Sequence, residues 1–435
     1  LWFGDLIHPD GFSAQISNGW AGSDWNGDLG WVYNSFYTDL GAWDWYAGYN
    51  STLTSFLNLV GEGGPLENDQ YYALGLVMKG LYYTQFTETH GMIPYSQASD
   101  PNIALPVYDA QIDVYKGVIS ELDQAISIIG DNTITGPGVS QLAENDVIFN
   151  GNMQNWKQLA NSLKLRIALR AHGSPGENFS ANAASEAIAS GVLADTDALF
   201  DAFTTETNIW GGSASYGDIW HSFAGSQWRA TEAMVNILQN NDDPRLSKIT
   251  KPCVGGTMTV LKPTDGENVP LIADHVAFLQ STLNEAGLVL GTDYTWTETA
   301  TDLTITMPDN TNYVGLPSRL SGKIKSYMHR DMFSEPSEIV TQKVNDFCNQ
   351  GPIFPTIVMT TADSHFMIAE AITKGLVSGD ANTYYQIGLE KAMALWNTTT
   401  SSDFLASEMG SLSGSSEQNL ERIATQRWVA NYTNG

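Results

Sequence analysis

Two segments of the chain place tryptophan and tyrosine among glycines and small polar residues, with no helical or strand period. They span residues 18–28 and 210–220. Indole and phenol rings stack on the apolar C–H faces of pyranose rings or on peptide side chains, while amide and carboxylate groups bond hydroxyls or amides. We therefore predict that these segments bind an oligomeric ligand. The candidate ligand-contacting residues are Trp20, Trp25, Asn26, Trp210, Tyr216 and Trp220.

A structural role is the alternative for these rings, because tryptophan is highly buried on average and can anchor a loop on the core. Both roles are compatible with the sequence of the two segments. The structural role is favoured for Trp156, Trp396 and Trp428, which fall on helical periods.

Catalytic motifs are missing from the sequence. It contains no Gly-x-Ser-x-Gly, no His-Glu-x-x-His, no phosphate-binding loop and no dinucleotide fingerprint. Residues 24–28 copy the start of a calcium-binding EF-hand loop, but Leu29 and Ser35 stand where glycine and a bidentate glutamate are required. We expect a binding protein with no catalytic residue, metal or cofactor. Because 48 acidic residues would form carboxylate pairs by chance, a helical carbohydrate-active enzyme is kept as an alternative.

The charge balance excludes several partners. The 435 residues include 48 acidic and 20 basic ones, which gives a net charge of −28. Nucleic acids and anionic lipid surfaces need basic residues to displace counterions, so neither is an expected partner. No apolar run approaches the roughly 18 residues that span a bilayer. Cys253 and Cys348 could form a disulfide or stay as two unpaired buried thiols.

Helical periodicity dominates the chain. Two apolar-periodic stretches fall within residues 31–60, and further helices are predicted over residues 67–89, 109–129, 155–170, 181–190, 230–240, 363–376 and 382–396. Between residues 255 and 315 the pattern changes, with period-two strands at 257–261 and 302–307 around a helix near 275–286. We predict a mainly α fold with a small α+β insertion.

The helix predicted over residues 155–170 is cationic, although the protein is strongly acidic. Its apolar face consists of Trp156, Leu159, Ala160, Leu163, Ile167 and Ala171. Its basic residues are Lys157, Lys164, Arg166 and Arg170, four of the 20 in the chain. The spacing by itself predicts only a well-anchored helix.

Several motifs in a fixed order accompany this helix. They are residues 91–98 (GMIPYSQA), 106–109 (PVYD), 145–151 (NDVIFNG), 243–246 (DPRL), 313–317 (YVGLP), 366–371 (FMIAEA) and 424–430 (ATQRWVA). With the cationic helix, this series resembles the SusD/RagB family of Bacteroidetes surface lipoproteins. The chain departs from the family pattern at Met92, where an acidic residue is usual, and at Ala362 and Asp363, where tyrosine and glutamate are usual.

The resemblance implies both a fold and a role. The fold would be mainly α, with tetratricopeptide-like helical hairpins and loop-rich insertions, as a single domain over residues 1–435 that contains the α+β patch at 255–315. The role would be that of a nutrient-binding lid on a SusC-like, TonB-dependent barrel at the extracellular face of the outer membrane. The captured ligand would be an oligosaccharide or, as an alternative, a peptide.

Two further expectations follow from the resemblance. Because family members carry a signal peptide, a lipid anchor and a longer C-terminal region, we expect this chain to be truncated at both ends. A purely structural tetratricopeptide-like adaptor, which would bind a protein surface and no small oligomer, is the remaining alternative.

Overall fold

The computed structural model describes residues 13–18, 45–132, 142–200, 228–262, 269–317, 330–342 and 354–434. Within these ranges the chain is mainly helical, with three small sheets, so the predicted fold class is confirmed. None of the described helices is long and apolar enough to cross a membrane. Whether residues 1–435 form a single domain stays a prediction.

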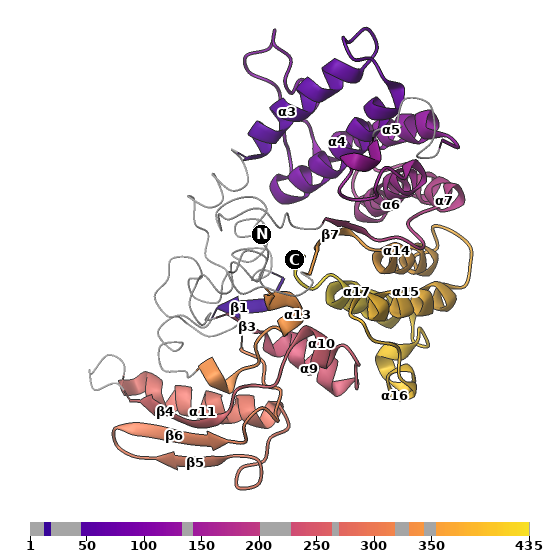
Figure 1. The fold of residues 1–435 in the computed structure, drawn as a ribbon. Helices are drawn as coiled ribbons and strands as arrows, with labels where there is room; N and C mark the ends of the chain where they lie inside the picture. Colours follow the sequence, from indigo (N-terminus) through magenta and orange to yellow (C-terminus); the bar gives the residue numbers. More distant parts are fainter. Residues whose placement is uncertain are drawn as a thin grey trace.

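Antiparallel helices form a curved stack along one side of the molecule (Figure 1). The N-terminal part of the stack comprises α3 (Trp45–Val60), α4 (Asp69–His90), α5 (Gln111–Ile129), α6 (Met153–Ala171) and α7 (Ser180–Ser190). The C-terminal part comprises α14 (Thr361–Thr373), α15 (Ala381–Leu395) and α17 (Ser416–Ala430). Side chains cap several helix starts and satisfy free backbone N–H groups, with Asn68 before α4, Asn152 before α6 and a Ser415–Gln418 capping box on α17.

Helix α6 lies at the centre of the stack, between the N-terminal hairpins and α14. All six residues of its predicted apolar face are buried, so that prediction is confirmed. Trp156 is also tied by its indole N–H, which donates to Asp146 Oδ2 at 2.7 Å. The burial extends beyond the predicted stripe to Asn161, Ser162 and Lys164, because α6 is covered from several sides. Because α6 is packed on several sides, it holds the side chains near its ends in fixed positions.

The helical spacing within residues 67–89 predicts one apolar face for α4, made of Tyr71, Leu74, Val77, Met78, Leu81 and Tyr82, and this prediction is partly wrong. Met78, placed on that face, is 42% exposed, whereas Tyr83 and Phe86 are buried. Close packing explains the rotation of the face, since Gly80 lets Leu122 of α5 approach the α4 backbone and a Cβ there would lie 2.9 Å from that side chain.

The first two motifs of the series form one hydrogen-bonded unit. Asp109 accepts the backbone N–H groups of Tyr95 and Ser96 at 3.0 and 2.8 Å, and its backbone pairs with Ile93 in an isolated bridge. These N–H groups lower the pKa of Asp109 although desolvation opposes them. Gly117 lets the Tyr95 ring pack on α5, because a Cβ there would lie 2.2 Å from the ring. The turn is thereby fixed against the stack.

Two short antiparallel ribbons link distant parts of the chain. Strand β1 (Ile16–Asn18) pairs with β3 (Trp228–Ala230), and β2 (Ala198–Phe200) pairs with β7 (Thr356–Met359). Strands of three or four residues are too short to show a period-two pattern, so the sequence did not predict them.

The predicted α+β insertion is present within residues 255–315. Strands β4 (Gly256–Leu261), β6 (Asp302–Met307) and β5 (Thr295–Glu298) form an antiparallel sheet in the order β4-β6-β5, accompanied by α11 (Val269–Glu285) (Figure 1). Apolar residues of the sheet, such as Met258 and Ile305, form a core with Leu279 and Leu283 of α11. The sequence predicted the helix and two of these strands but missed β5.

Short elements complete the described structure. They are η4 (Leu142–Glu144), α9 (Glu232–Asn240), α10 (Leu246–Ile249), η5 (Arg330–Met332), α13 (Glu338–Thr341), α16 (Ser402–Ala406) and η6 (Glu408–Gly410). Helix α9 begins later than predicted, because residues 228–230 are used as β3.

Candidate binding site

A cavity of about 680 Å³ lies where α6, α14 and α17 meet the N-terminal residues Ser13 and Gln15. Its volume falls in the usual range for ligand pockets. The residues that line it are Ser13, Gln15, Arg166, Leu169, Arg170, His172, Val358, Met359, Asp363, Glu370, Lys374, Leu420, Ala424, Arg427, Trp428, Asn431 and Asn434. Hereafter this is called the junction cavity.

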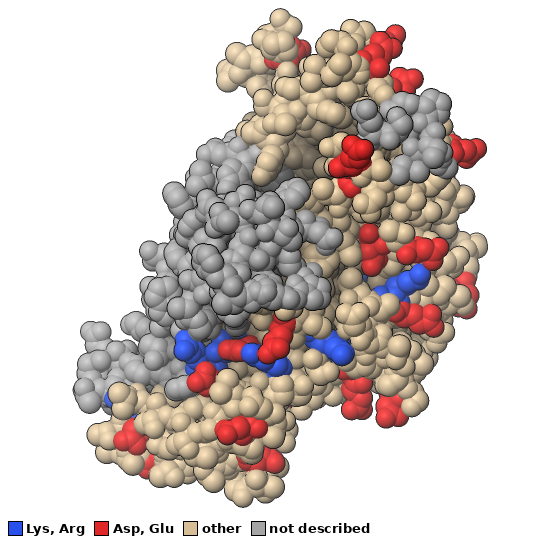
Figure 2. Space-filling model, viewed as in Figure 1, with Lys and Arg blue, Asp and Glu red and all other residues tan. Residues whose placement is uncertain are grey.

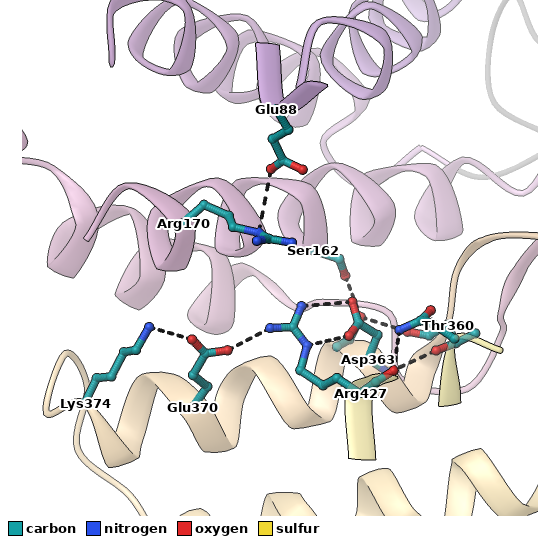
Figure 3. A network of polar contacts seen from close by, with 10 residues as sticks. Glu88, Ser162, Arg170, Thr360, Asp363, Glu370, Lys374 and Arg427 are labelled. Atoms are coloured by element: carbon teal, nitrogen blue, oxygen red, sulfur yellow. Dashed lines mark hydrogen bonds and ion pairs between the residues drawn. The ribbon is translucent and has the colours of Figure 1, made fainter. Parts of the chain in front are cut away.

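One wall of the junction cavity is an ion-pair network between α14 and α17. Arg427 donates from Nε to Asp363 Oδ1 and from Nη1 to Glu370 Oε2, both at 2.7 Å (Figure 3). Lys374 reaches the other oxygen of Glu370 at 2.6 Å. Burial alone would raise the pKa of Asp363, but the neighbouring Arg427 charge and its hydrogen bonds hold that pKa below the ordinary value. Both carboxylates are therefore committed to holding the two helices together.

The opposite wall carries two arginines near the C-terminal end of α6. Arg166 and Arg170 are four residues apart, which places them on the same helical face. Arg166 Nη2 donates to Glu88 Oε2 of α4 at 2.6 Å. Arg170 Nε lies 3.9 Å from Glu88 Oε1 (Figure 3). The Arg170 side chain is 58% exposed. One glutamate thus faces two guanidinium groups.

The other two basic residues of α6 are structural. Lys157 donates to the backbone carbonyl of Gly130 at 2.9 Å, and the buried Lys164 lies between Asp123 and Glu186, 2.6 Å from each. These two carboxylates raise the pKa of Lys164 against the opposing effect of burial. The basic residues of α6 therefore fall into two pairs. Lys157 and Lys164 stabilise the packing of the helix, whereas Arg166 and Arg170 line the junction cavity.

The junction cavity is more basic than the protein as a whole. Its lining residues include three arginines and one lysine but only two carboxylates, whereas the chain carries 48 acidic and 20 basic residues. Figure 2 shows acidic side chains scattered over the helical stack and the insertion, with most of the basic ones visible on this face gathered in a band low in the view.

The N-terminal segment is fastened to the rim of the cavity. Gln15 Nε2 donates to the backbone carbonyls of Trp428 and Asn431, each at 3.1 Å, and the Trp428 indole N–H donates to the Ser13 carbonyl at 2.7 Å. Trp428 is therefore structural, as predicted, and also lines the cavity. Trp396 is fully buried and stacks on Phe354 with ring centroids 4.6 Å apart, which confirms its structural role.

The ribbon of β1 and β3 leads from this rim to the two tryptophan-rich segments. In its register Asn18 lies opposite Trp228. Residue 19 continues from the end of β1, and residue 227 precedes the start of β3, so both segments join the described structure at one end of the same ribbon.

The six candidate ligand-contacting residues lie outside the described residues. Trp20, Trp25 and Asn26 follow β1, and Trp210, Tyr216 and Trp220 precede β3. Their role stays a prediction. The sequence did not predict the junction cavity, although the Arg166 and Arg170 spacing and the Arg427-Trp428 motif were its visible signals.

Metal and thiol chemistry find little support in the part of the chain that the structure describes. There, no group of three or more His, Cys, Asp or Glu side chains is placed to hold a metal ion. Cys253 is buried as a free thiol, and burial raises its pKa to about 11, which keeps it protonated and unreactive. Cys348 lies outside the described residues.

Comparison with solved structures places the fold among SusD homologues. The chain is 20% identical to a SusD homologue from Bacteroides ovatus, with a TM-score of 0.70, and the match covers 99% of this chain and 79% of that one. A SusD homologue from Bacteroides uniformis matches at 20% identity and a TM-score of 0.67, with the same coverage. A chitin-binding protein matches at 19% identity and a TM-score of 0.69, again with the same coverage. No curated protein sequence matches the chain.

A family comparison extends this from fold to membership. The profile described as "Starch-binding associating with outer membrane" matches residues 20–265 and 296–435. The gap between these ranges removes the whole of α11 and the first residue of β5, so the matched part includes the helical stack together with β4, β6 and the rest of β5. The chain therefore belongs to the SusD-like family of nutrient-binding proteins associated with the outer membrane.

Proposed function

We propose that this protein captures oligosaccharides at the extracellular face of the outer membrane, without catalysis, as the lid of a SusC-like, TonB-dependent barrel. The observation that carries the proposal is the register of β1 with β3, which sets Asn18 opposite Trp228, so the chain continues toward both tryptophan-rich segments from one end of the same ribbon. Segments far apart in sequence can then contribute rings to one ligand. Family membership supports nutrient binding at this membrane.

Capture without chemistry agrees with the carboxylates of the junction cavity. A glycosidase needs one carboxyl group with a raised pKa as general acid and a second as base or nucleophile. Here the pKa of Asp363 is lowered, and both Asp363 and Glu370 accept hydrogen bonds from Arg427. These groups are therefore unsuited to proton transfer, which favours a binding protein over the enzyme alternative.

An oligosaccharide is favoured over a peptide as ligand. Indole rings present flat apolar surfaces that match pyranose C–H faces, and the amides at the cavity rim can bond hydroxyls. The starch-binding description of the family and the chitin-binding relative support the same choice. A peptide remains the second candidate, because aromatic rings and amides would bind it as well.

A lid needs only modest affinity on its own. When two partners enclose one ligand, contacts from both contribute, and the second set forms at high effective concentration. Hinged closure is a common way to bring such contacts together. We therefore expect the isolated protein to bind more weakly than its complex with the barrel.

Paired substitutions in the two segments test the ligand site. Trp20→Ala with Trp25→Ala, and Trp210→Ala with Trp220→Ala, should each weaken oligosaccharide binding by about 1–3 kcal/mol per contacting ring. The midpoint of thermal unfolding should stay unchanged, whereas Trp396→Ala, which empties a buried site, should lower it strongly. Isothermal titration and thermal unfolding of the three variants provide the measurement. If both pairs lose stability and keep binding, the rings belong to the core and the proposal fails.

Purification from native membranes tests the partner. A stoichiometric outer-membrane barrel that co-purifies and is identified by mass spectrometry would support the lid. A protein that leaves the membrane alone, with no barrel attached after mild crosslinking, would contradict that part of the proposal and favour an adaptor or an enzyme.

A further inference from the structure

We infer that the junction cavity binds a carboxylate of an acidic sugar, through Arg170 and Arg166, so that the captured ligands are oligosaccharides that contain uronic acid. This inference rests on the proposed capture function and specifies the ligand class. The two walls of the junction cavity differ in how far the donors of their cationic side chains are already paired within the fold.

The arginines on the α6 wall have donors to spare. Arg170 makes no hydrogen bond within the described residues, and its one ion pair, with Glu88, is 3.9 Å long. Arg166 uses Nη2 for Glu88, but its Nε is buried and has no hydrogen-bond partner there. A buried donor without an acceptor costs free energy that a ligand acceptor would recover. The planar fork of a guanidinium matches a carboxylate with two parallel hydrogen bonds.

The charge of the cavity also needs an explanation. A protein of net charge −28 repels anions at long range. Yet four of its 20 basic residues line the junction cavity, against two carboxylates that already accept hydrogen bonds from Arg427. Counting Glu88, which faces both α6 arginines, the site keeps an excess of one positive charge. That excess suits a ligand with isolated carboxylates, while the surrounding acidic surface disfavours a densely charged polyanion.

The rest of the lining fits a sugar better than a bare inorganic anion. Leu169, Val358 and Leu420 supply apolar surface, and Trp428 adds part of an indole ring. Asn431 and Asn434 supply amides that can bond hydroxyl groups. Apolar surface, amides and one cationic fork together match the C–H face, hydroxyls and carboxylate of a uronic acid.

Matched ligands test this inference. The probes are trisaccharides of galacturonate, glucuronate and mannuronate, each compared by isothermal titration with its own full methyl ester, which keeps the sugar units and linkages but carries no charge. For at least one sugar the free acid should bind about 10- to 100-fold more tightly than the ester, the effect of one charge-assisted contact. The variant Arg170→Gln should lose most of this preference while keeping its affinity for the ester. The control Lys116→Gln removes a cation from the exposed surface of α5 and should keep the preference.

Each contrary outcome has its own meaning. If acid and ester bind equally, or if only neutral oligosaccharides bind, the carboxylate inference is overturned and oligosaccharide capture stands. An acid preference that survives in Arg170→Gln also overturns it, because the carboxylate is then recognised elsewhere. If no sugar binds, while a peptide with a free C-terminal carboxylate binds and its amide does not, both the acidic-sugar inference and the proposed glycan capture fail.

Discussion

The two walls of the junction cavity use the same chemical group for different ends. Arg427 has a carboxylate on each side and is held at 2.7 Å from both (Figure 3). Arg170 is more than half exposed, and its one charged neighbour is 3.9 Å away. An arginine whose donors are satisfied within the fold holds helices together, whereas an arginine with free donors at a cavity can bind a ligand. The positive charge of an arginine does not distinguish these two roles. The roles differ in how many of its N–H donors already have an acceptor within the fold.

The largest effect should come from the satisfied wall. Arg427→Met leaves Asp363 and Glu370 without their common partner, and breaking a buried pair in this way typically costs about 3–5 kcal/mol. Urea unfolding should show this loss in the free energy of unfolding. As a control, Lys391→Met removes a lysine whose partner Asp195 is exposed, and should cost less than about 1 kcal/mol. Equal losses in the two variants would show that the network does not hold α14 and α17 together.

Acid should weaken the same wall. Because the pKa of Asp363 is lower in the fold than its ordinary value of 3.8, its contribution to stability is present above that value and is lost as pH falls through the folded pKa. His365 adds a loss of stability that begins at higher pH. Burial lowers its pKa below 6.5, so protonation begins to favour the unfolded chain below that pH. As the pH is lowered, the free energy of unfolding should therefore begin to fall below pH 6.5 and should fall steeply below about pH 4.

The Arg427→Met variant serves as the control for that acid dependence. Without its cationic partner, the buried Asp363 should have a raised pKa, so the steep loss of stability below about pH 4 should become shallower. Urea unfolding at several pH values compares the two proteins. An unchanged slope in the variant would assign the acid sensitivity to other carboxylates.

The sequence predicted the elements that carry their own period. Helices of 11 to 22 residues, such as α7 and α4, showed apolar spacing, and the order of the motifs identified the family. Motifs also survived local departures. Asp363 stands where the family usually has glutamate, yet it still accepts hydrogen bonds from Arg427.

The junction cavity could not be predicted in the same way. Its walls come from residues near 13, 170, 360 and 430, and the contact between Gln15 and Trp428 joins positions 413 apart in sequence. No local period records such a contact. The three-residue strands β1 and β3 also show no period in the sequence. Their pairing nevertheless brings together the two chain positions, Asn18 and Trp228, that lead to the tryptophan-rich segments.

A final prediction concerns Glu88, the carboxylate that contacts both arginines of the α6 wall. Its carboxylate is the internal competitor of any ligand at Arg170, so Glu88→Gln should raise the affinity for uronate trisaccharides severalfold and leave their methyl esters unaffected. The cost in unfolding free energy should be about 1 kcal/mol or less, because Arg170 and part of Arg166 remain solvated. The double variant Glu88→Gln with Arg170→Gln should show no gain. If Glu88→Gln instead weakens acid binding, Glu88 orients the arginines for the ligand, and the two walls are more alike than their distances indicate.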